Sequence, residues 1–361
     1  MNHPIVIVGA GIVGASIAWN LARRGKSVLI LDQTGIGKGA TARSFGWINA
    51  NFAETPAYFA LRSAAIDAHH EMEAALDPVA TRWCGCLWWE DVGAAFDAHA
   101  AELAAFGYAA QVVAKPEIAR MAPALAHPPE RAIHVAREGG ADGEVIAARL
   151  TEAAVAFGAK VWIGPKVTSL LRQDVRVIGV ATDHGPVPAS RVIIAAGAGA
   201  AALTSLPMAN KPGLILRTRP LSPFLGPIIM APDVHFRQDV EGRIVAGEIF
   251  SGDGPAQASI TTDPGALADE LVRRIQAHLP DQKIEIELVT LGQRPVPKDG
   301  LPAVGLLEDG LYLASMHSGI TLAPLIGTLV AQEIAEGRHS SELAPFRPTR
   351  FSQRLENILG G

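Results

Sequence analysis

Ile5-Val6-Ile7-Val8-Gly9-Ala10-Gly11-Ile12-Val13-Gly14 is the stretch that decides the fold of this 361-residue chain. Its first four residues are β-branched and are followed by glycine, which predicts a buried strand. Residues 12–24 carry small and apolar side chains at helical spacing, and Gly25 then ends the predicted helix. Residues 28–31 predict a second buried strand, which runs into Asp32. A strand, a helix and a strand within about 30 residues predict two parallel neighbouring strands.

The glycines of this stretch form a G-x-G-x-x-G pattern, and its position between a strand and a helix is typical of dinucleotide binding. Gly9 permits a tight turn, Gly11 lets the backbone approach a pyrophosphate, and Gly14 lets the helix pack closely on the strand. The helix N-terminus favours the anionic pyrophosphate. We expect Asp32 to accept hydrogen bonds from a ribose, and Gln33 offers no arginine for a phosphorylated ribose. The pattern alone leaves open FAD, NAD, and a tight turn without a ligand.

Composition excludes several classes of protein. The chain is 49% hydrophobic and 19% charged, with a formal net charge of -5. This apolar fraction excludes a mostly disordered protein, and the absence of a basic block argues against nucleic-acid binding. We see no signal peptide and no run of about 20 apolar residues, so we expect a cytoplasmic protein without a transmembrane helix. Cys84 and Cys86 are the only cysteines, and we expect neither a disulfide nor a metal site.

Three further segments have the composition of backbone that lies against a bulky cofactor. The first is the small-residue loop Gly37-Lys38-Gly39-Ala40-Thr41-Ala42-Arg43-Ser44. The second is the strand and glycine turn of residues 192–198. The third comprises residues 294–305 (RPVPKDGLPAVG) and 311–324 (LYLASMHSGITLAP), in which a strand, a small-residue turn and a helix follow one another. The N-terminus of that helix is a second positive end that favours negative charge.

On these segments the chain resembles the D-amino-acid-oxidase-type FAD-dependent oxidoreductases. This family includes glycine oxidase, sarcosine oxidase and bacterial D-amino acid dehydrogenases, and the resemblance covers essentially the whole chain. The patterns R-P-x-x-K-D-G-x-P-x-x-G at residues 294–305 and H-x-G-x-x-L-A-P at residues 317–324 are its most specific part, and they are most like glycine oxidase.

The resemblance implies an α/β fold with a Rossmann-like FAD-binding domain and an antiparallel-sheet substrate domain of α+β type. We expect the FAD-binding domain to comprise residues 1–80, 140–212 and 291–361, and the substrate-binding domain residues 81–139 and 213–290. The implied activity is oxidation of the C–N bond of a small amino acid or secondary amine by hydride transfer to flavin N5, with hydrolysis of the imine product. The implied partners are this substrate, O2 or a quinone as electron acceptor, and further copies of the chain or other subunits.

The resemblance also implies a set of residues around noncovalent FAD, carried over from the matching motifs. These are Gly9, Gly11, Ile12, Val13, Gly14, Asp32, Gln33, Ala40, Thr41, Ala42, Arg43, Ser44, Gly46, Trp47, Val167, Ala196, Gly197, Arg294, His317, Ser318, Gly319, Ile320 and Thr321.

The substrate side of the site departs from the family pattern. In glycine oxidase an arginine after the histidine of this motif binds the substrate carboxylate, whereas His317 is followed here by Ser318 and Gly319. We therefore expect another arginine to bind it, because Arg holds a carboxylate bidentately. Arg217, Arg219, Arg237 and Arg294 are candidates, and we favour Arg217 and Arg237. We expect Asn49 and Trp88 to complete the substrate pocket, and His317, Arg237 and Arg217 to act in catalysis.

Other interpretations remain open. His317 contacts the flavin or substrate in one interpretation and fixes a turn in the other. Val245 stands where sarcosine-oxidase relatives carry a lysine, which leaves a dehydrogenase open. We expect His69 and His70 to lie on the surface. The alternative functions are an NAD-dependent dehydrogenase and an FAD-binding subunit of a hetero-oligomeric amine dehydrogenase.

Overall fold

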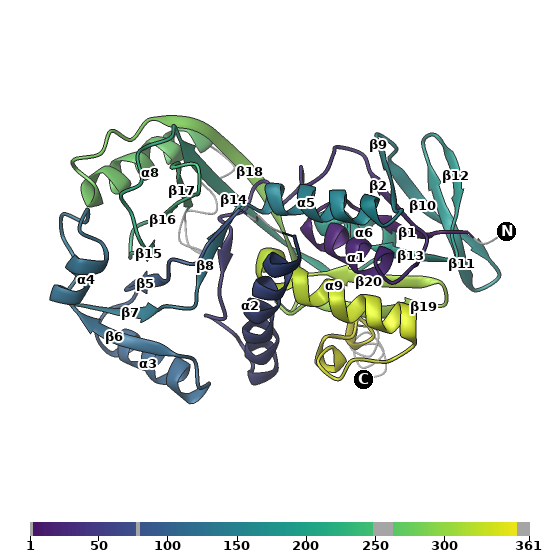
Figure 1. The fold of residues 1–361 in the computed structure, drawn as a ribbon, viewed down its shortest axis with the longest axis horizontal. Coiled ribbons are helices and arrows are strands. Elements are labelled where there is room, and N and C mark those ends of the chain that lie inside the picture. The colour runs from purple at the N-terminus through teal and green to yellow at the C-terminus, as the bar shows by residue number, and fades with distance from the viewer. Residues whose placement is uncertain (1–2, 77–79, 248–262, 352–361) are drawn as a thin grey trace.

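A six-stranded sheet carries the glycine-rich stretch at its centre, in the strand order β19-β20-β13-β1-β2-β9 (Figure 1). The computed structural model describes residues 3–76, 80–247 and 263–351. The strands of this sheet are β1 (Ile5–Val8), β2 (Val28–Asp32), β9 (Lys160–Ile163), β13 (Arg191–Ile194), β19 (Ala303–Glu308) and β20 (Leu311–Ser315). All neighbours pair in parallel except β19 and β20. The predicted pairing of the first two strands is confirmed.

Helices cover one face of this sheet. Helix α1 (Ile12–Ala22) packs between α5 (Gly143–Ala156) and α9 (Gly319–Glu336). A Cβ added at Gly14 would lie 2.0 Å from the carbonyl oxygen of Gly9, so only glycine lets α1 approach β1 this closely. The packing role expected for Gly14 is therefore confirmed.

A three-stranded sheet, β10 (Val167–Gln173), β11 (Arg176–Thr182) and β12 (Gly185–Pro188), covers the opposite face. Its inner side chains, Val177 and Val180, share an apolar core with Val192 and Ile194 of β13. Short segments η1 (Gly197–Gly199) and α6 (Ala200–Thr204) follow β13. The central strands are thus buried on both faces, as a parallel sheet requires.

An eight-stranded sheet forms the second lobe, in the order β18-β14-β17-β16-β15-β5-β7-β6. Its strands are β5 (Cys86–Trp88), β6 (Ala110–Ala114), β7 (Arg131–Val135), β14 (Met208–Thr218), β15 (Ile228–Met230), β16 (His235–Gln238), β17 (Ile244–Gly247) and β18 (Ile286–Pro297). Neighbours pair antiparallel except β15 and β5. Helix α8 (Pro264–His278) packs on one face, with Leu271 and Ile275 in the core beside Phe236. Helices α3 (Gly93–Ala105) and α4 (Lys115–Met121) lie at the β6 edge (Figure 1).

The two lobes meet along the long strands β14 and β18 and around helix α2 (Pro56–Leu76), which lies between them (Figure 1). A small sheet of β3 (Trp47–Ile48), β8 (Gly139–Ala141) and β4 (Thr81–Arg82) also joins them. The segment η2 (Ala344–Phe346) lies beside β19. The expected domain limits at residues 212 and 290 fall inside β14 and β18, and the limits themselves remain a prediction.

The predicted fold class, an α/β lobe with an antiparallel-sheet lobe, is confirmed. Residues 81–91 contain two separate strands, β4 and β5, which belong to different sheets. In the described ranges, every helix is too short or too polar to span a bilayer.

Candidate active site

A cavity of about 1530 Å³ extends from the carboxyl end of β1 to the inner face of the eight-stranded sheet. Its walls combine the glycine loop, segment 38–47, the turn after β13, and the turn between β20 and α9. Residues far apart in the sequence therefore meet around one elongated space. Its opening between two lobes is typical of a site that holds a long ligand.

The end of the cavity near β1 fits the dinucleotide half of FAD. Gly9 adopts a φ of +111°, and a Cβ there would lie 2.4 Å from the carbonyl oxygen of Ala195. Asp32, at the end of β2, accepts the backbone N–H of Ala10 at 2.9 Å and lines the cavity. The N-cap residue of α1, Gly11, has no side chain, and the Thr41 hydroxyl accepts the N–H of Ile12 at 3.1 Å. Gly11, Ile12 and Val13 line the cavity, and the positive end of the helix there favours an anion.

The turn that precedes α9 forms another part of the cavity wall, and Gly319 there lies next to the side chain of Val13 in α1. Ser318 holds a left-handed conformation with a φ of 55°, and no side chain caps the N-terminus of α9. The Thr321 hydroxyl donates to the carbonyl oxygen of Trp47 at 3.2 Å. This contact joins α9 to β3, so the two segments expected to face the flavin are held together.

His317 lies in this part of the cavity wall, and its imidazole is held neutral. Burial lowers its pKa to about 3, and the nearby cations Arg294, Arg62 and Lys211 act in the same direction. All four side chains line the cavity. The site at neutral pH therefore combines an uncharged imidazole with a group of positive charges.

Most of the expected cofactor residues line the cavity. These are Gly9, Gly11, Ile12, Val13, Asp32, Gln33, Ala40, Thr41, Arg43, Ser44, Gly46, Trp47, Val167, Ala196, Gly197, Arg294, His317, Ser318, Gly319 and Ile320. Gly14, Ala42 and Thr321 do not line it and instead support the segments that do.

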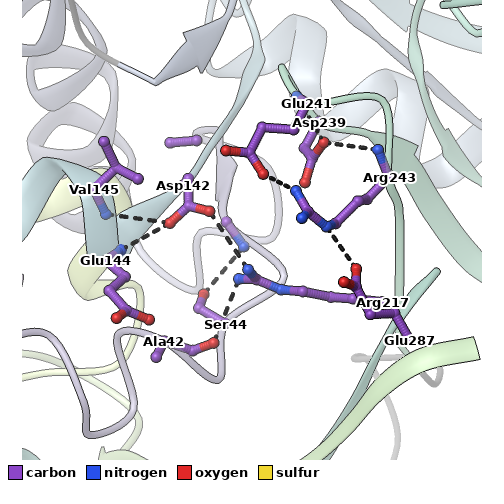
Figure 2. Close-up of polar contacts among 12 residues, drawn as sticks. Ala42, Ser44, Asp142, Glu144, Val145, Arg217, Asp239, Glu241, Arg243 and Glu287 are labelled. Carbon is purple, nitrogen blue, oxygen red and sulfur yellow. Dashed lines mark hydrogen bonds and ion pairs between the residues drawn. The ribbon is translucent and has the colours of Figure 1, made fainter. Parts of the chain in front are cut away.

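Arg217 lies outside the cavity lining, contrary to the catalytic and substrate-binding role expected for it. Its Nη1 lies 3.4 Å from Asp142 Oδ2, and its Nη2 donates to the carbonyl oxygen of Ala42 at 3.4 Å (Figure 2). Asp142 in turn caps α5, because its Oδ1 accepts the N–H groups of Glu144 and Val145. Arg217 is thus engaged in a contact between the lobes.

Arg237 is also outside the cavity lining, and its side chain is only 2% exposed. Its Nε donates to the carbonyl oxygen of Phe45 at 2.6 Å, and its Nη2 donates to that of Ala141 at 2.9 Å. Burial lowers the pKa of this guanidinium to about 10, although Asp239 and Asp142 oppose that shift. The arginine holds the segment after the cofactor loop against β8, and two of its three nitrogens are bonded to protein carbonyl groups.

Trp88 also lies outside the cavity lining, whereas Asn49 is part of it. The Trp88 ring is 1% exposed and lies 4.5 Å from the ring of His99. Asn49 accepts hydrogen bonds from Arg62 with both its backbone and side-chain oxygens. Of the residues that we favoured for substrate binding, the structure brings only Asn49 to the cavity, and the further candidate Arg294 also lines it.

Several polar side chains line the cavity although we did not expect them there. They are Arg62, Glu90, Glu102, Lys211 and His235. Arg62 belongs to the buried stripe of α2, with Leu61, Ala65 and Ile66, and an arginine on such a stripe is the signal that could have revealed it. The surface position expected for His69 is wrong, because this residue is fully buried and its Nε2–H donates to the carbonyl oxygen of Ile320 at 2.8 Å.

Glu138 is a buried acid behind this wall. Its carboxylate accepts the indole N–H of Trp47 at 2.8 Å and the hydroxyl of Tyr108 at 2.7 Å. The Tyr108 oxygen in turn accepts the N–H of Ala50 at 3.2 Å. Burial raises the pKa of Glu138 to about 7, and its hydrogen bonds oppose the shift. This acid therefore holds the segment that begins with β3.

Changing Glu138 to Gln should alter the pH dependence of stability. The pKa of Glu138 is raised from 4.5 to about 7, so its favourable contribution to folding is complete below pH 4.5 and is lost as the pH rises through 7. At about 1.4 kcal/mol per pH unit, the loss amounts to about 3 kcal/mol. Denaturant unfolding at both ends of this range should show that loss in the wild type and not in the variant. An equal pH dependence of the two proteins would contradict the expected shift.

Comparison with known proteins agrees with the cavity. The model of the family FAD dependent oxidoreductase (DAO) matches residues 4–333. Glycine oxidase of Geobacillus kaustophilus is 28% identical over 97% of each chain. A protein of Rhizobium meliloti that is named as one of the subunits of opine oxidase is 27% identical over 96% of this chain and 97% of its own.

A crystal structure of glycine oxidase from Geobacillus kaustophilus superimposes with a TM-score of 0.83 at 25% identity, covering 97% of this chain and 99% of that one. The family match sets aside the NAD-dependent alternative. Cys84 and Cys86 are free thiols outside the cavity lining, so neither is placed to bond covalently to the flavin. The glycine cradle, the two helix N-termini at the cavity and the match over residues 4–333 together show that this chain belongs to the DAO family of FAD-dependent oxidoreductases.

Proposed function

We propose that this chain oxidises the C–N bond of a small α-amino acid whose nitrogen is a primary or a secondary amine. Its relatives are named for glycine and for opines, which are N-substituted amino acids. The observation that carries the proposal is the group of three cations, Arg62, Lys211 and Arg294, around the neutral imidazole of His317. These three cations favour an anionic group of the substrate, such as a carboxylate.

FAD supplies the two-electron acceptor for this reaction, which takes a hydride from the substrate α-carbon. The α C–H bond breaks, a C=N bond forms, and the amine releases a proton to solvent before water hydrolyses the imine. The residues of this chain bind the substrate and set its protonation. The cations near His317 lower the pKa of a bound ammonium group, which favours the neutral amine that can release a hydride.

A turnover panel tests the proposal. We expect at least one of glycine, sarcosine, D-alanine, proline and iminodiacetate to be converted to an oxo acid by the FAD-loaded protein. Peroxide formed in air identifies an oxidase, and reduction of a dye only in the absence of air identifies a dehydrogenase that passes electrons to a quinone or another carrier. Failure of every compound with both acceptors, in protein that retains FAD, would contradict the proposal.

The relative in Rhizobium meliloti is named as one subunit of a larger enzyme, which supports a second candidate function. This candidate is an FAD-binding subunit of a hetero-oligomeric amine dehydrogenase. In that case the isolated chain should bind FAD and yet turn over slowly until a partner subunit is added. Co-purification from the native host followed by activity measurement tests this candidate. The two free thiols favour the reducing cytoplasm as the location of either form.

A further inference from the structure

Arg62 is a buried cation in the wall of the cavity, on the inner stripe of α2. Its side chain is only 6% exposed. In the part of the chain that the structure describes, no carboxylate lies within ion-pair distance of its guanidinium. Glu138 is close enough to interact electrostatically, but its oxygens accept hydrogen bonds from Trp47 and Tyr108. A buried charge without an ionic partner is costly, and an anion from outside the chain would remove that cost.

The guanidinium is held in a fixed orientation. Its Nε donates to the backbone carbonyl of Asn49 at 3.1 Å, and its Nη2 donates to the side-chain oxygen of the same residue. The side chain also lies over the ring of Tyr58, with 5.3 Å from its Cζ to the ring centroid. Neither hydrogen bond uses Nη1, and the residue lines the cavity. A fixed guanidinium edge matches the planar geometry of a carboxylate better than a mobile ammonium does.

The position of Arg62 relative to the reaction centre follows from its neighbours. It acts electrostatically on His317, which begins the turn before α9, and Asn49 follows directly on β3. These two segments are joined by the bond from Thr321 to Trp47. An anion on Arg62 therefore lies beside two segments that are expected to face the flavin.

We infer that Arg62 binds the carboxylate of the substrate and that Asn49 positions its guanidinium, an inference that rests on the proposed function. In this arrangement Arg62 takes the place that sequence reasoning gave to Arg217 and Arg237. Both of those arginines are already bonded to protein oxygens at the contact between the lobes.

Acetate and its neutral isostere acetamide test the inference without turnover. Binding of either compound to the FAD-loaded protein is followed by the change in the visible flavin spectrum. The wild type should bind acetate and discriminate strongly against acetamide. Arg62→Gln should weaken acetate binding by about 30-fold or more, since a hydrogen bond to a charged group is lost. Arg62→Lys should restore part of that loss, and the exposed-helix control Arg149→Gln should bind acetate as the wild type does.

Kinetics separate the two residues. Arg62→Gln should raise the KM for the best amino acid by a similar factor. Asn49→Ala keeps the backbone acceptor and removes only the charge-assisted hydrogen bond that orients Arg62, so it should raise the KM by about 5-fold. Acetate affinity within about 3-fold of the wild type in Arg62→Gln would overturn the inference, because an interaction with a charged group is worth more than that. The inference would also be overturned if Arg62→Gln folded and lost its affinity for FAD, with its affinity for acetate unchanged. If acetate binding depends on Arg62 and no amino acid reduces the flavin, the inference holds and the proposed function fails.

Discussion

Replacing Gly11 with valine is expected to give a folded protein that purifies without FAD. Gly11 has an ordinary negative φ of -68°, and the nearest atom to an added Cβ is the Thr41 hydroxyl oxygen at 3.2 Å. A side chain at this position therefore requires the Thr41 hydroxyl to shift by a few tenths of an ångström, and an added Cβ meets no backbone atom. Gly11 lines the cavity, however, where a pyrophosphate must contact the backbone directly. We expect the affinity for FAD to fall by at least about 100-fold, because the added side chain takes the place of the phosphates.

The matched comparison is Gly265→Ala, in the first turn of α8, where an added Cβ meets only Asp263 Oδ1 at 3.6 Å. Titration of the apoproteins with FAD measures the affinities, and far-ultraviolet circular dichroism reports the fold. Gly265→Ala should retain wild-type FAD binding. If Gly11→Val also bound FAD with wild-type affinity, the cavity near β1 would not be the pyrophosphate site.

Replacing Arg237 with methionine is expected to destabilise the protein by about 3–5 kcal/mol, the range found when one partner of a buried charged contact is removed. The change leaves the carbonyl oxygens of Phe45 and Ala141 without their donors in a buried place. It also leaves Asp239 and Asp142 without the nearby positive charge. Arg237→Lys should rescue little, because a single ammonium cannot reach two separate carbonyl groups as the fork does.

Denaturant unfolding measures this effect, and Arg219→Gln is the control on the same sheet. The side chain of Arg219 is 71% exposed, and its removal should change the free energy of unfolding by less than about 0.5 kcal/mol. Molecules of Arg237→Met that fold should bind acetate as the wild type does. A stable Arg237→Met variant with weakened acetate binding would return Arg237 to the substrate-binding role expected from the sequence.

The cofactor half of the site could be predicted because its requirements are local. A backbone that touches a pyrophosphate needs glycine at fixed positions, and the strand before it and the helix after it are visible in the same short stretch of sequence. Gly9, Gly11 and Asp32 therefore line the cavity where the pattern placed them. The same holds for the turn at His317, which a short motif defines.

The substrate half depends on contacts between distant segments, which a single sequence does not reveal. Arg237 and His235 share one face of β16, yet His235 lines the cavity and Arg237 does not. The difference arises because Phe45 and Ala141, from two other parts of the chain, lie over Arg237. Arg62 was missed for a related reason, since its spacing on α2 is that of a residue packed in an apolar core.

Anaerobic mixing of the FAD-loaded wild-type protein with the amino acid panel tests the central claim most directly, because it isolates reduction of the flavin from the choice of acceptor. We expect at least one small amino acid or N-substituted amino acid to bleach the visible flavin absorbance. Methylamine, which lacks a carboxylate, should not do so at the same concentration. Protein whose flavin is reduced by dithionite but by no member of the panel would contradict the account.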